Sequence, residues 1–239
     1  MIGPPALPTG VVVEAREQGA LYRLLRVRRV NEAATRGMLL AHALPGQFVR
    51  VETAGEQTYF ALADAPDPAG DALELLIKRG GAVADALFGL VPGDRLAMSD
   101  PEGDGFPIDL ACGLDLVLVA AGSGIAAIRA VLAAVAKRRN EFGRIALYYG
   151  QARAEDFAFA SEFLTRRSAA LTVTLCASAA AADWSGARGR VQSALSADAP
   201  KWNPTRTAVF VCGMAAMEDE VQALMEAHGV SASRIFTNA

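Results

Sequence analysis

Two glycines that follow an apolar run are the first residues here whose type and spacing suggest a chemical role. Residues 116–120 read Leu-Val-Leu-Val-Ala, and Gly122-Ser123-Gly124 comes just before a predicted helix. Backbone N–H groups and the positive end of a helix attract an anion, and glycines let a pyrophosphate approach the main chain closely. The third glycine of the dinucleotide-binding fingerprint is missing, because the helix continues Ile125-Ala126-Ala127. A glycine turn that serves only packing therefore explains the motif equally well.

A cysteine ends a second apolar run. Residues 207–212 read Thr-Ala-Val-Phe-Val-Cys, and Gly213 and Met214 separate them from a helix predicted to begin at 215. Ligands of open parallel sheets bind outside the carboxyl ends of the strands, so Cys212 is expected to line such a crevice. A buried thiol that packs as a small hydrophobic residue is the commoner role of a cysteine. Taken alone, this motif favours the packing role.

The elements that must position these residues differ between the two halves of the chain. Before residue 111, short apolar runs separated by turn residues predict strands at 11–13, 21–27, 48–51, 59–63, 73–78 and 95–98, with one helix at 83–90. This pattern favours a small barrel or sandwich. From residue 114, strands at 116–120, 144–149, 171–176 and 207–212 alternate with helices at 125–139, 154–167 and 215–228. The alternation predicts a parallel sheet with helices on both faces, and hence two domains, 1–111 and 112–239.

Composition excludes several classes of protein. Of the 239 residues, 52% are hydrophobic and 21% charged, which excludes a disordered chain, and the net charge of -3 argues against a nucleic-acid partner. Cys112, Cys176 and Cys212 are too widely spaced for a disulfide framework or a CxxC metal site, and two histidines support no histidine-based metal centre. No signal peptide and no membrane-spanning run is visible. These observations predict a cytoplasmic protein that binds no metal, no nucleic acid and no membrane.

Several segments, in their order and spacing, resemble the ferredoxin–NADP⁺ reductase family. The nucleotide domain of that family carries an apolar strand into Gly-Thr/Ser-Gly-Ile-x-Pro, a Tyr-Gly-x-Arg turn and Cys-Gly-Pro-x-x-Met; segments 118–128, 147–153 and 209–217 are similar to these patterns. In the N-terminal half, residues 45–49 resemble a strand of the family's barrel. Residues 105–110 and 147–150 carry a narrower match to the fruit-protein type of FAD/NAD(P)-binding oxidoreductase. The resemblance implies an antiparallel β-barrel that binds flavin, followed by a Rossmann-like NAD(P)-binding domain.

The resemblance also implies where FAD would bind. The family's Arg-x-Tyr-Ser motif aligns with Thr58-Tyr59-Phe60-Ala61, in which Phe60 is expected to pack on the flavin but Thr58 lacks the arginine's charge. Lys78 or Arg79 could supply that charge from the next strand, and the main-chain donors of residues 81–84 are expected to bind phosphate. Phe236 is a candidate for stacking on the flavin, although burial in the sheet as a strand phenylalanine is the favoured role. The implied FAD-binding residues are Thr58, Tyr59, Phe60, Ala61, Lys78, Gly81, Ala82, Val83, Ala84 and Phe236.

For the nicotinamide nucleotide, the resemblance implies contacts at the ends of several strands. Ala127 and Met214 replace prolines of the family pattern, which loosens both turns without deleting a functional group. Arg188 and Arg190 are candidates for a 2′-phosphate or lie in a solvated loop, and Arg153 contacts the nucleotide or only the solvent, so the choice between NADH and NADPH stays open. The implied NAD(P)-binding residues are Gly122, Ser123, Gly124, Ile125, Arg153, Arg188, Arg190, Cys212, Gly213 and Met214.

The function implied is that of a flavin-dependent NAD(P)H oxidoreductase. Hydride would pass from the nicotinamide, near Gly124 and the catalytic candidate Cys212, to FAD, and then electrons would pass to a one-electron carrier protein or a partner subunit. The departures at Thr58 and Ala61 favour an alternative, a degenerate family member that binds a nucleotide or a protein partner without turnover. A flavin-free NAD(P) dehydrogenase is a third hypothesis, but no acid–base pair supports it.

Overall fold

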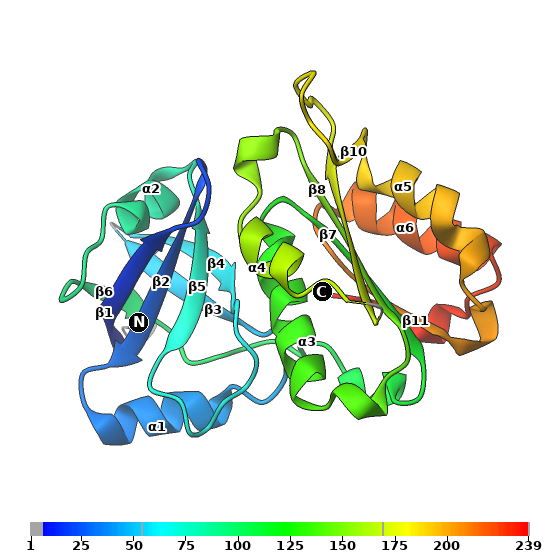
Figure 1. Cartoon of the computed structure of the whole chain (residues 1–239). Helices are drawn as coiled ribbons and strands as arrows, with labels where there is room; N and C mark the ends of the chain where they lie inside the picture. Colours follow the sequence, from blue (N-terminus) through cyan, green and yellow to red (C-terminus); the bar gives the residue numbers. More distant parts are fainter. Residues whose placement is uncertain (1–6, 54, 169, 239) are drawn as a thin grey trace.

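Six antiparallel strands form the first half of the chain (Figure 1). The computed structural model describes residues 7–53, 55–168 and 170–238 and places the strands in the order β4-β3-β6-β1-β2-β5. A bridge between Leu62 and Leu75 links the end of β4 to β5, and alternate residues of the strands fill one apolar core. The predicted antiparallel barrel is confirmed. Its strands are β1 Thr9–Glu17, β2 Tyr22–Arg29, β3 Phe48–Thr53, β4 Glu56–Ala61, β5 Leu73–Lys78 and β6 Arg95–Met98.

Two helices accompany the barrel. Helix α2, Ala82–Phe88, corresponds to the helix predicted at 83–90 and ends earlier because Gly89 caps it. Helix α1, Glu32–Ala41, lies where no helix is predicted. The Asn31 side chain caps its first turn by accepting a hydrogen bond from the Ala34 N–H at 2.8 Å, while Met38 and Leu39 pack into the barrel core. A single pair of buried apolar residues is too short a pattern to predict this helix.

The second half is a parallel sheet in the order β10-β9-β8-β7-β11-β12, with helices on both faces (Figure 1). Helices α3 and α4 cover the face toward the barrel, and α5 and α6 cover the other. The predicted Rossmann-like fold is confirmed. Its elements are β7 Asp115–Ala121, α3 Ile125–Lys137, β8 Ile145–Gln151, α4 Ala160–Thr165, β9 Leu171–Ala177, β10 Ala187–Arg188, α5 Val191–Asp198, β11 Thr207–Cys212, α6 Ala215–Ala227 and β12 Ile235–Thr237. Short 3-10 helices are η1 Ile108–Ala111, η2 Gly122–Gly124, η3 Arg139–Glu141, η4 Ala154–Asp156, η5 Ala199–Lys201, η6 Pro204–Arg206 and η7 Ala232–Arg234.

The continuous helix predicted at 154–167 is wrong. The chain forms η4 and then the short α4, and the break between them carries two buried rings, Phe157 and Phe159. Phe159 has a φ of 58°, a left-handed conformation that no helix interior accommodates. Elements α5 and β10 are not predicted from the sequence, and β12 is anticipated only through the expected burial of Phe236 in the sheet. No helix in the described part of the chain is long and apolar enough to cross a membrane.

The barrel and the parallel sheet share packed side chains. Tyr22 and Leu24 of β2 belong to the same buried cluster as residues of α3 and β7, and the Phe106 ring meets the Phe210 ring edge to face at 5.6 Å. The predicted domain boundary at 111–112 falls between the end of β6 at Met98 and the start of β7 at Asp115. The division into two domains stays a prediction. The shared cluster nonetheless fixes how the two sheets face each other.

One arginine crosses this interface. Arg129 of α3 donates hydrogen bonds to the Ala63 carbonyl at 2.6 Å and to Glu74 of β5 at 2.7 Å. Its Nε donates to Glu162 of α4 at 2.9 Å, and its guanidinium lies 4.4 Å from the centre of the Phe159 ring. Arg129 therefore ties the barrel, α3 and the unusual Phe159 segment to one another.

Arg129→Ala is expected to lower the free energy of unfolding by about 2–4 kcal/mol, because it leaves Glu74 and Glu162 without their main partner. This expected loss is smaller than for a fully buried ion pair. The side chains of Arg129, Glu74 and Glu162 keep 15%, 16% and 24% of their surface exposed. Urea denaturation measures the change. Arg166→Ala is the matched control, because Arg166 pairs with the same Glu162 from an exposed position, and we expect less than about 1 kcal/mol there. Equal effects of the two variants would contradict the role of Arg129.

Asp64 makes the stability of this interface depend on pH. Its Oδ1 is buried with no hydrogen-bond partner among the described residues, and burial together with the nearby Glu74 raises the pKa of Asp64 to about 7, against the opposing charge of Arg129. The folded chain therefore holds a proton that the unfolded chain releases between about pH 4 and pH 7, so the free energy of unfolding falls as pH rises through this range. Asp64→Asn is expected to flatten that fall, which denaturation at pH 5 and pH 8 measures. The control Asp104→Asn removes an exposed carboxyl and should leave the pH dependence of the free energy of unfolding unchanged. The same pH dependence in Asp64→Asn as in the parent would contradict the assignment to Asp64.

Candidate functional site

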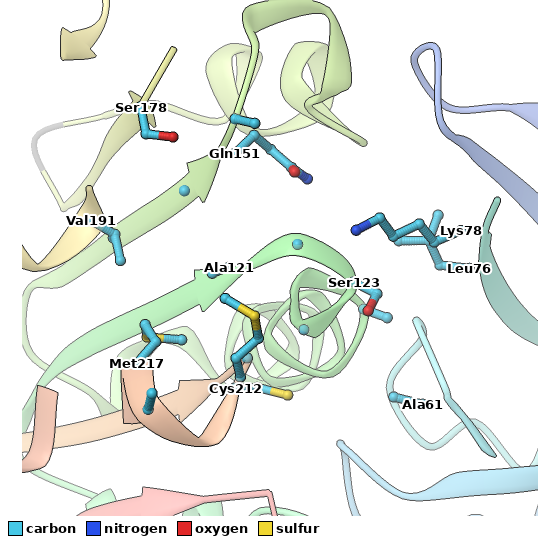
Figure 2. Close-up of a pocket in the computed structure, with 18 of the residues that line it drawn as sticks. Ala61, Leu76, Lys78, Ala121, Ser123, Gln151, Ser178, Val191, Cys212 and Met217 are labelled. Carbon is cyan, nitrogen blue, oxygen red and sulfur yellow. The ribbon is translucent and has the colours of Figure 1, made fainter. Parts of the chain in front are cut away.

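A cleft of about 980 Å³ lies between the barrel and the carboxyl edge of the parallel sheet (Figure 2). Strands β4 and β5 form one wall, and the residues that follow β7, β8, β9 and β11 form the other. The carboxyl ends of parallel strands meet at one edge of a sheet, so residues distant in sequence converge there. The cleft thus brings together these residues expected from the sequence: Thr58, Tyr59, Phe60, Ala61, Lys78, Ala84, Gly122, Ser123, Gly124, Arg190, Cys212, Gly213 and Met214.

The other expected site residues do not line the cleft. The Phe236 ring stacks on Phe210 at 4.9 Å, as in the alternative of burial in the sheet. Arg153 pairs with Asp156 at 3.1 Å, and Arg188 donates to carbonyls of residues 180–182. Val83 and Ile125 are buried in the two cores, and Gly81 and Ala82 lie just beyond the lining residue Gly80.

The glycine turn and the cysteine turn press against each other. Gly122-Ser123-Gly124 forms η2 between β7 and α3, and β11, which ends at Cys212, is the neighbour of β7. A Cβ on Gly124 would lie 2.2 Å from the Cys212 carbonyl oxygen and 2.9 Å from the Gly213 nitrogen. Only glycine fits there, which explains the second glycine of the motif. The close packing also sets the positions of the two turns relative to each other.

The Cys212 thiol is neutral. Burial, with a smaller contribution from the charge of Glu218, raises the pKa of Cys212 to about 12, and the nearby Asn238 side chain acts in the opposite direction. A thiol that stays protonated at neutral pH is a poor nucleophile. Cys212 can therefore contact a bound ring and position it, but covalent chemistry is not favoured.

The barrel wall presents one exposed ring. Successive residues of β4 point to opposite faces, so Tyr59 and Phe60 diverge. Phe60 is 8% exposed and belongs to the barrel core, whereas Tyr59 is 62% exposed and meets the Phe48 ring edge to face at 5.3 Å. Tyr59 therefore offers the larger free aromatic surface on this wall, and Phe60 only a small part of its ring.

Positive charge enters the cleft from three side chains. Lys78 of β5 points away from its strand into the cleft (Figure 2), and Arg79, next to it, stacks on the Phe88 ring at 4.0 Å. Arg190 lines the opposite wall. Within the described ranges, none of the three forms an ion pair with a carboxylate. These unpaired charges, with the open backbone at Gly80, suit a ligand that carries phosphate groups.

Sequence reasoning missed residues that follow the predicted strands by one or two positions. Gln151, at the end of β8, donates to the Tyr149 hydroxyl at 2.6 Å and to the Tyr22 hydroxyl at 3.0 Å, so it connects the two halves at the cleft. Its position just after the strand predicted at 144–149 could have indicated that it lies at the cleft. The cleft-lining residues outside the expected set are Leu76, Gly80, Ala121, Ala126, Gly150, Gln151, Ala152, Cys176, Ser178, Gly189, Val191, Gln192, Ala216, Met217 and Glu220.

Gly124→Ala is expected to push the glycine turn away from Cys212, because the added methyl group has no room against a backbone carbonyl. We expect a loss of about 1–3 kcal/mol of stability and at least a tenfold loss of NAD(P) affinity, measured by denaturation and calorimetric titration. Gly37→Ala, in the exposed part of α1, is the control: nothing lies within 4 Å of its Cβ, so binding should not change. Normal binding by Gly124→Ala would show that the turn does not touch the nucleotide.

Comparisons with known proteins agree with this geometry. A family model described as the oxidoreductase NAD-binding domain matches residues 118–223. Sulfhydrogenase 1 subunit gamma of Pyrococcus furiosus is 31% identical over 196 residues, which cover 80% of this chain and 66% of that protein. The ferredoxin–NAD(+) reductase component of the alkene monooxygenase system of Xanthobacter autotrophicus is 33% identical over 205 residues, 82% of this chain and 61% of that protein. The chain therefore spans less than two thirds of the length of these relatives.

Solved structures share the two-part fold. A ferredoxin NADP+ reductase from Neisseria gonorrhoeae with bound FAD and NADP matches with a TM-score of 0.80 and 18% identity over 98% of both chains. The ferredoxin reductase in carbazole 1,9a-dioxygenase matches with a TM-score of 0.81 and 20% identity, over 100% of this chain and 71% of that one. At these low sequence identities, the solved structures establish the fold of this chain and nothing more. Together with the match of residues 118–223 to the oxidoreductase NAD-binding domain and the similarity to the curated relatives, they show that this chain has the ferredoxin-reductase-like fold.

Proposed function

We propose that this chain is a flavin-dependent NAD(P)H oxidoreductase. The observation that carries the proposal is the single cleft with two unlike walls: the barrel on one side, and the glycine and cysteine turns of the NAD-binding domain on the other. Two ring systems bound to opposite walls would meet within the same space. Bound FAD would supply the acceptor, taking the hydride (two electrons and one proton) that NAD(P)H loses as it becomes NAD(P)⁺.

The residues of the barrel wall fit a flavin nucleotide. The cleft of about 980 Å³ lies at the upper end of the roughly 300–1,000 Å³ typical of small-molecule sites, which suits an extended dinucleotide. Thr58 lacks the charge of the family's arginine, but Lys78 and Arg79 stand on the adjoining strand with no carboxylate partner among the described residues. Tyr59 offers an exposed ring for stacking. We propose that these residues hold FAD, with the charge that binds its phosphates displaced from β4 to the end of β5.

The residues of the opposite wall would orient the nicotinamide nucleotide. The N–H groups at Gly122-Ser123-Gly124, at the start of α3, would face its phosphates, and the neutral Cys212 thiol would lie beside its ring. Hydride transfer needs alignment of the two rings and exclusion of water more than it needs an acid or base. The cleft supplies alignment, because Gly124 and Cys212 are in direct contact.

The electron acceptor is proposed to be a carrier protein or a partner subunit. The names of two relatives support this: one is the gamma subunit of a sulfhydrogenase, and the other is the ferredoxin–NAD(+) reductase component of a monooxygenase system. The alternative of a family member that binds without turnover predicts a protein that neither retains FAD nor oxidises NAD(P)H.

The visible absorption spectrum of the purified protein, recorded before and after addition of FAD and gel filtration, tests the proposal. Retained flavin bands, together with reduction of ferricyanide by NADH or NADPH, would support the oxidoreductase. A protein that stays colourless and inactive with excess FAD would overturn it in favour of the binding alternative.

Replacement of both Lys78 and Arg79 by alanine is expected to weaken FAD binding about tenfold to hundredfold, because charge-assisted bonds to phosphate contribute roughly 1.5–3 kcal/mol. Quenching of FAD fluorescence on binding measures the affinity. Lys201→Ala, a surface lysine that pairs with Asp198 away from the cleft, is the control and should bind FAD like the parent. Unchanged affinity in the double variant would mean that the phosphates bind elsewhere.

A further inference from the structure

The turn that carries Cys212 is held by a carboxylate. The Gly213 N–H donates a 2.9 Å hydrogen bond to Oε1 of Glu218, in the first turn of α6. We propose that Glu218 is a positioning residue for hydride transfer, acting through this bond on the Cys212–Gly213 turn; the inference rests on the proposed function. No sequence pattern predicts this role of Glu218, because its partner is a backbone N–H.

Because residue 214 is a methionine, the Cys212–Gly213 turn needs a restraint from another residue. The family pattern has proline at this position, where the ring fixes φ; here the backbone of Met214 has φ −76° and ψ 142°, values that a proline would also adopt. Methionine leaves φ free to vary. Within the described residues, the Met214 N–H donates to no acceptor, and its side chain is 75% exposed. The turn therefore gains little rigidity from Met214 itself.

Two other contacts limit the movement of the Cys212–Gly213 turn without binding its N–H. The Gly124 backbone blocks movement in one direction, and the Met217 methyl group lies over Gly213, where a Cβ would approach it to 2.2 Å. Cys212 and Met217 occupy the same corner of the cleft (Figure 2). Met214 accepts hydrogen bonds from Met217 and Glu218, which fix the start of α6. Among the described residues, the Glu218 carboxylate is the one acceptor of the Gly213 N–H, which lies between the thiol and the helix.

Loss of this bond would let the thiol shift. A displacement of about 1 Å in a group that orients a reacting ring costs on the order of a hundredfold in rate. Glu218 is half-buried, and burial raises its pKa, so it is not a freely solvated helix-end charge. An acidic residue in the first turn also stabilises any helix through its dipole. The test must separate this general effect from positioning.

The experiment compares four variants in the FAD-loaded protein by anaerobic stopped-flow reduction with saturating NADH or NADPH. Glu218→Ala should lower the first-order rate of flavin reduction about tenfold to hundredfold while leaving FAD retention unchanged. Glu218→Gln should keep a rate near the parent's, because the amide oxygen accepts the same bond without charge. Adding Met214→Pro to Glu218→Ala should recover most of the rate, because proline presets the turn. Glu226→Ala, on the exposed end of α6, is the control and should match the parent.

A second measurement needs no cofactor. Hydrogen exchange at the Gly213 amide, followed by NMR, should accelerate in Glu218→Ala and stay slow in Glu218→Gln. The positioning role is wrong if Glu218→Ala reduces flavin as fast as the parent. It is also wrong if Glu218→Gln is as slow as Glu218→Ala, since charge would then be the cause, or if Met214→Pro restores melting temperature but not rate. A parent protein that never reduces flavin would instead refute the proposed function, while the exchange data would still report on the bond.

Discussion

The contact between Gly124 and the Cys212 carbonyl is the constraint on which the cleft depends. No side chain fits between these two backbones, so the turn after β7 and the turn after β11 occupy fixed relative positions. The contact follows from topology, because β7 and β11 are neighbours in a parallel sheet and end at the same edge. The N–H groups proposed to bind phosphate and a neutral thiol are thereby presented together, and the Glu218 bond to Gly213 completes the arrangement from the helix side.

The barrel contributes the second wall only because its orientation is fixed. The shared apolar cluster, Arg129 and the bond from Gln151 to Tyr22 all link β2 or β5 to the parallel sheet. Because both walls are already held in place, ligand binding costs little free energy for rearrangement of the protein. This view also explains how a family motif can lose its arginine at Thr58: Lys78 and Arg79, at the end of β5, still place positive charge on the same wall.

Local sequence patterns predicted the strands better than the helices. Strands β5, β6 and β11 match their predicted bounds, because each is an apolar run with turn residues on both sides. The 154–167 segment failed because its break depends on tertiary contacts: Phe159 adopts a left-handed conformation under the Arg129 guanidinium, which no local pattern encodes. In the site, Gly124 and Cys212 were predictable from their place after buried strands. Gln151 could also be placed at the cleft by its position after a predicted strand, but its bond to a barrel hydroxyl could not be predicted. Glu218 was not predictable, because its partner is a backbone N–H.

The central claim is that one cleft aligns a nicotinamide ring with a flavin. Its most direct test is an anaerobic titration of the FAD-loaded protein with NADH and, separately, NADPH, followed by visible absorbance. Loss of the oxidised-flavin band at close to one equivalent of either nucleotide, within the mixing time of a manual titration, is the predicted result. A protein that binds both FAD and the nucleotide, yet keeps the oxidised band at excess nucleotide, would contradict the claim that the two walls align them.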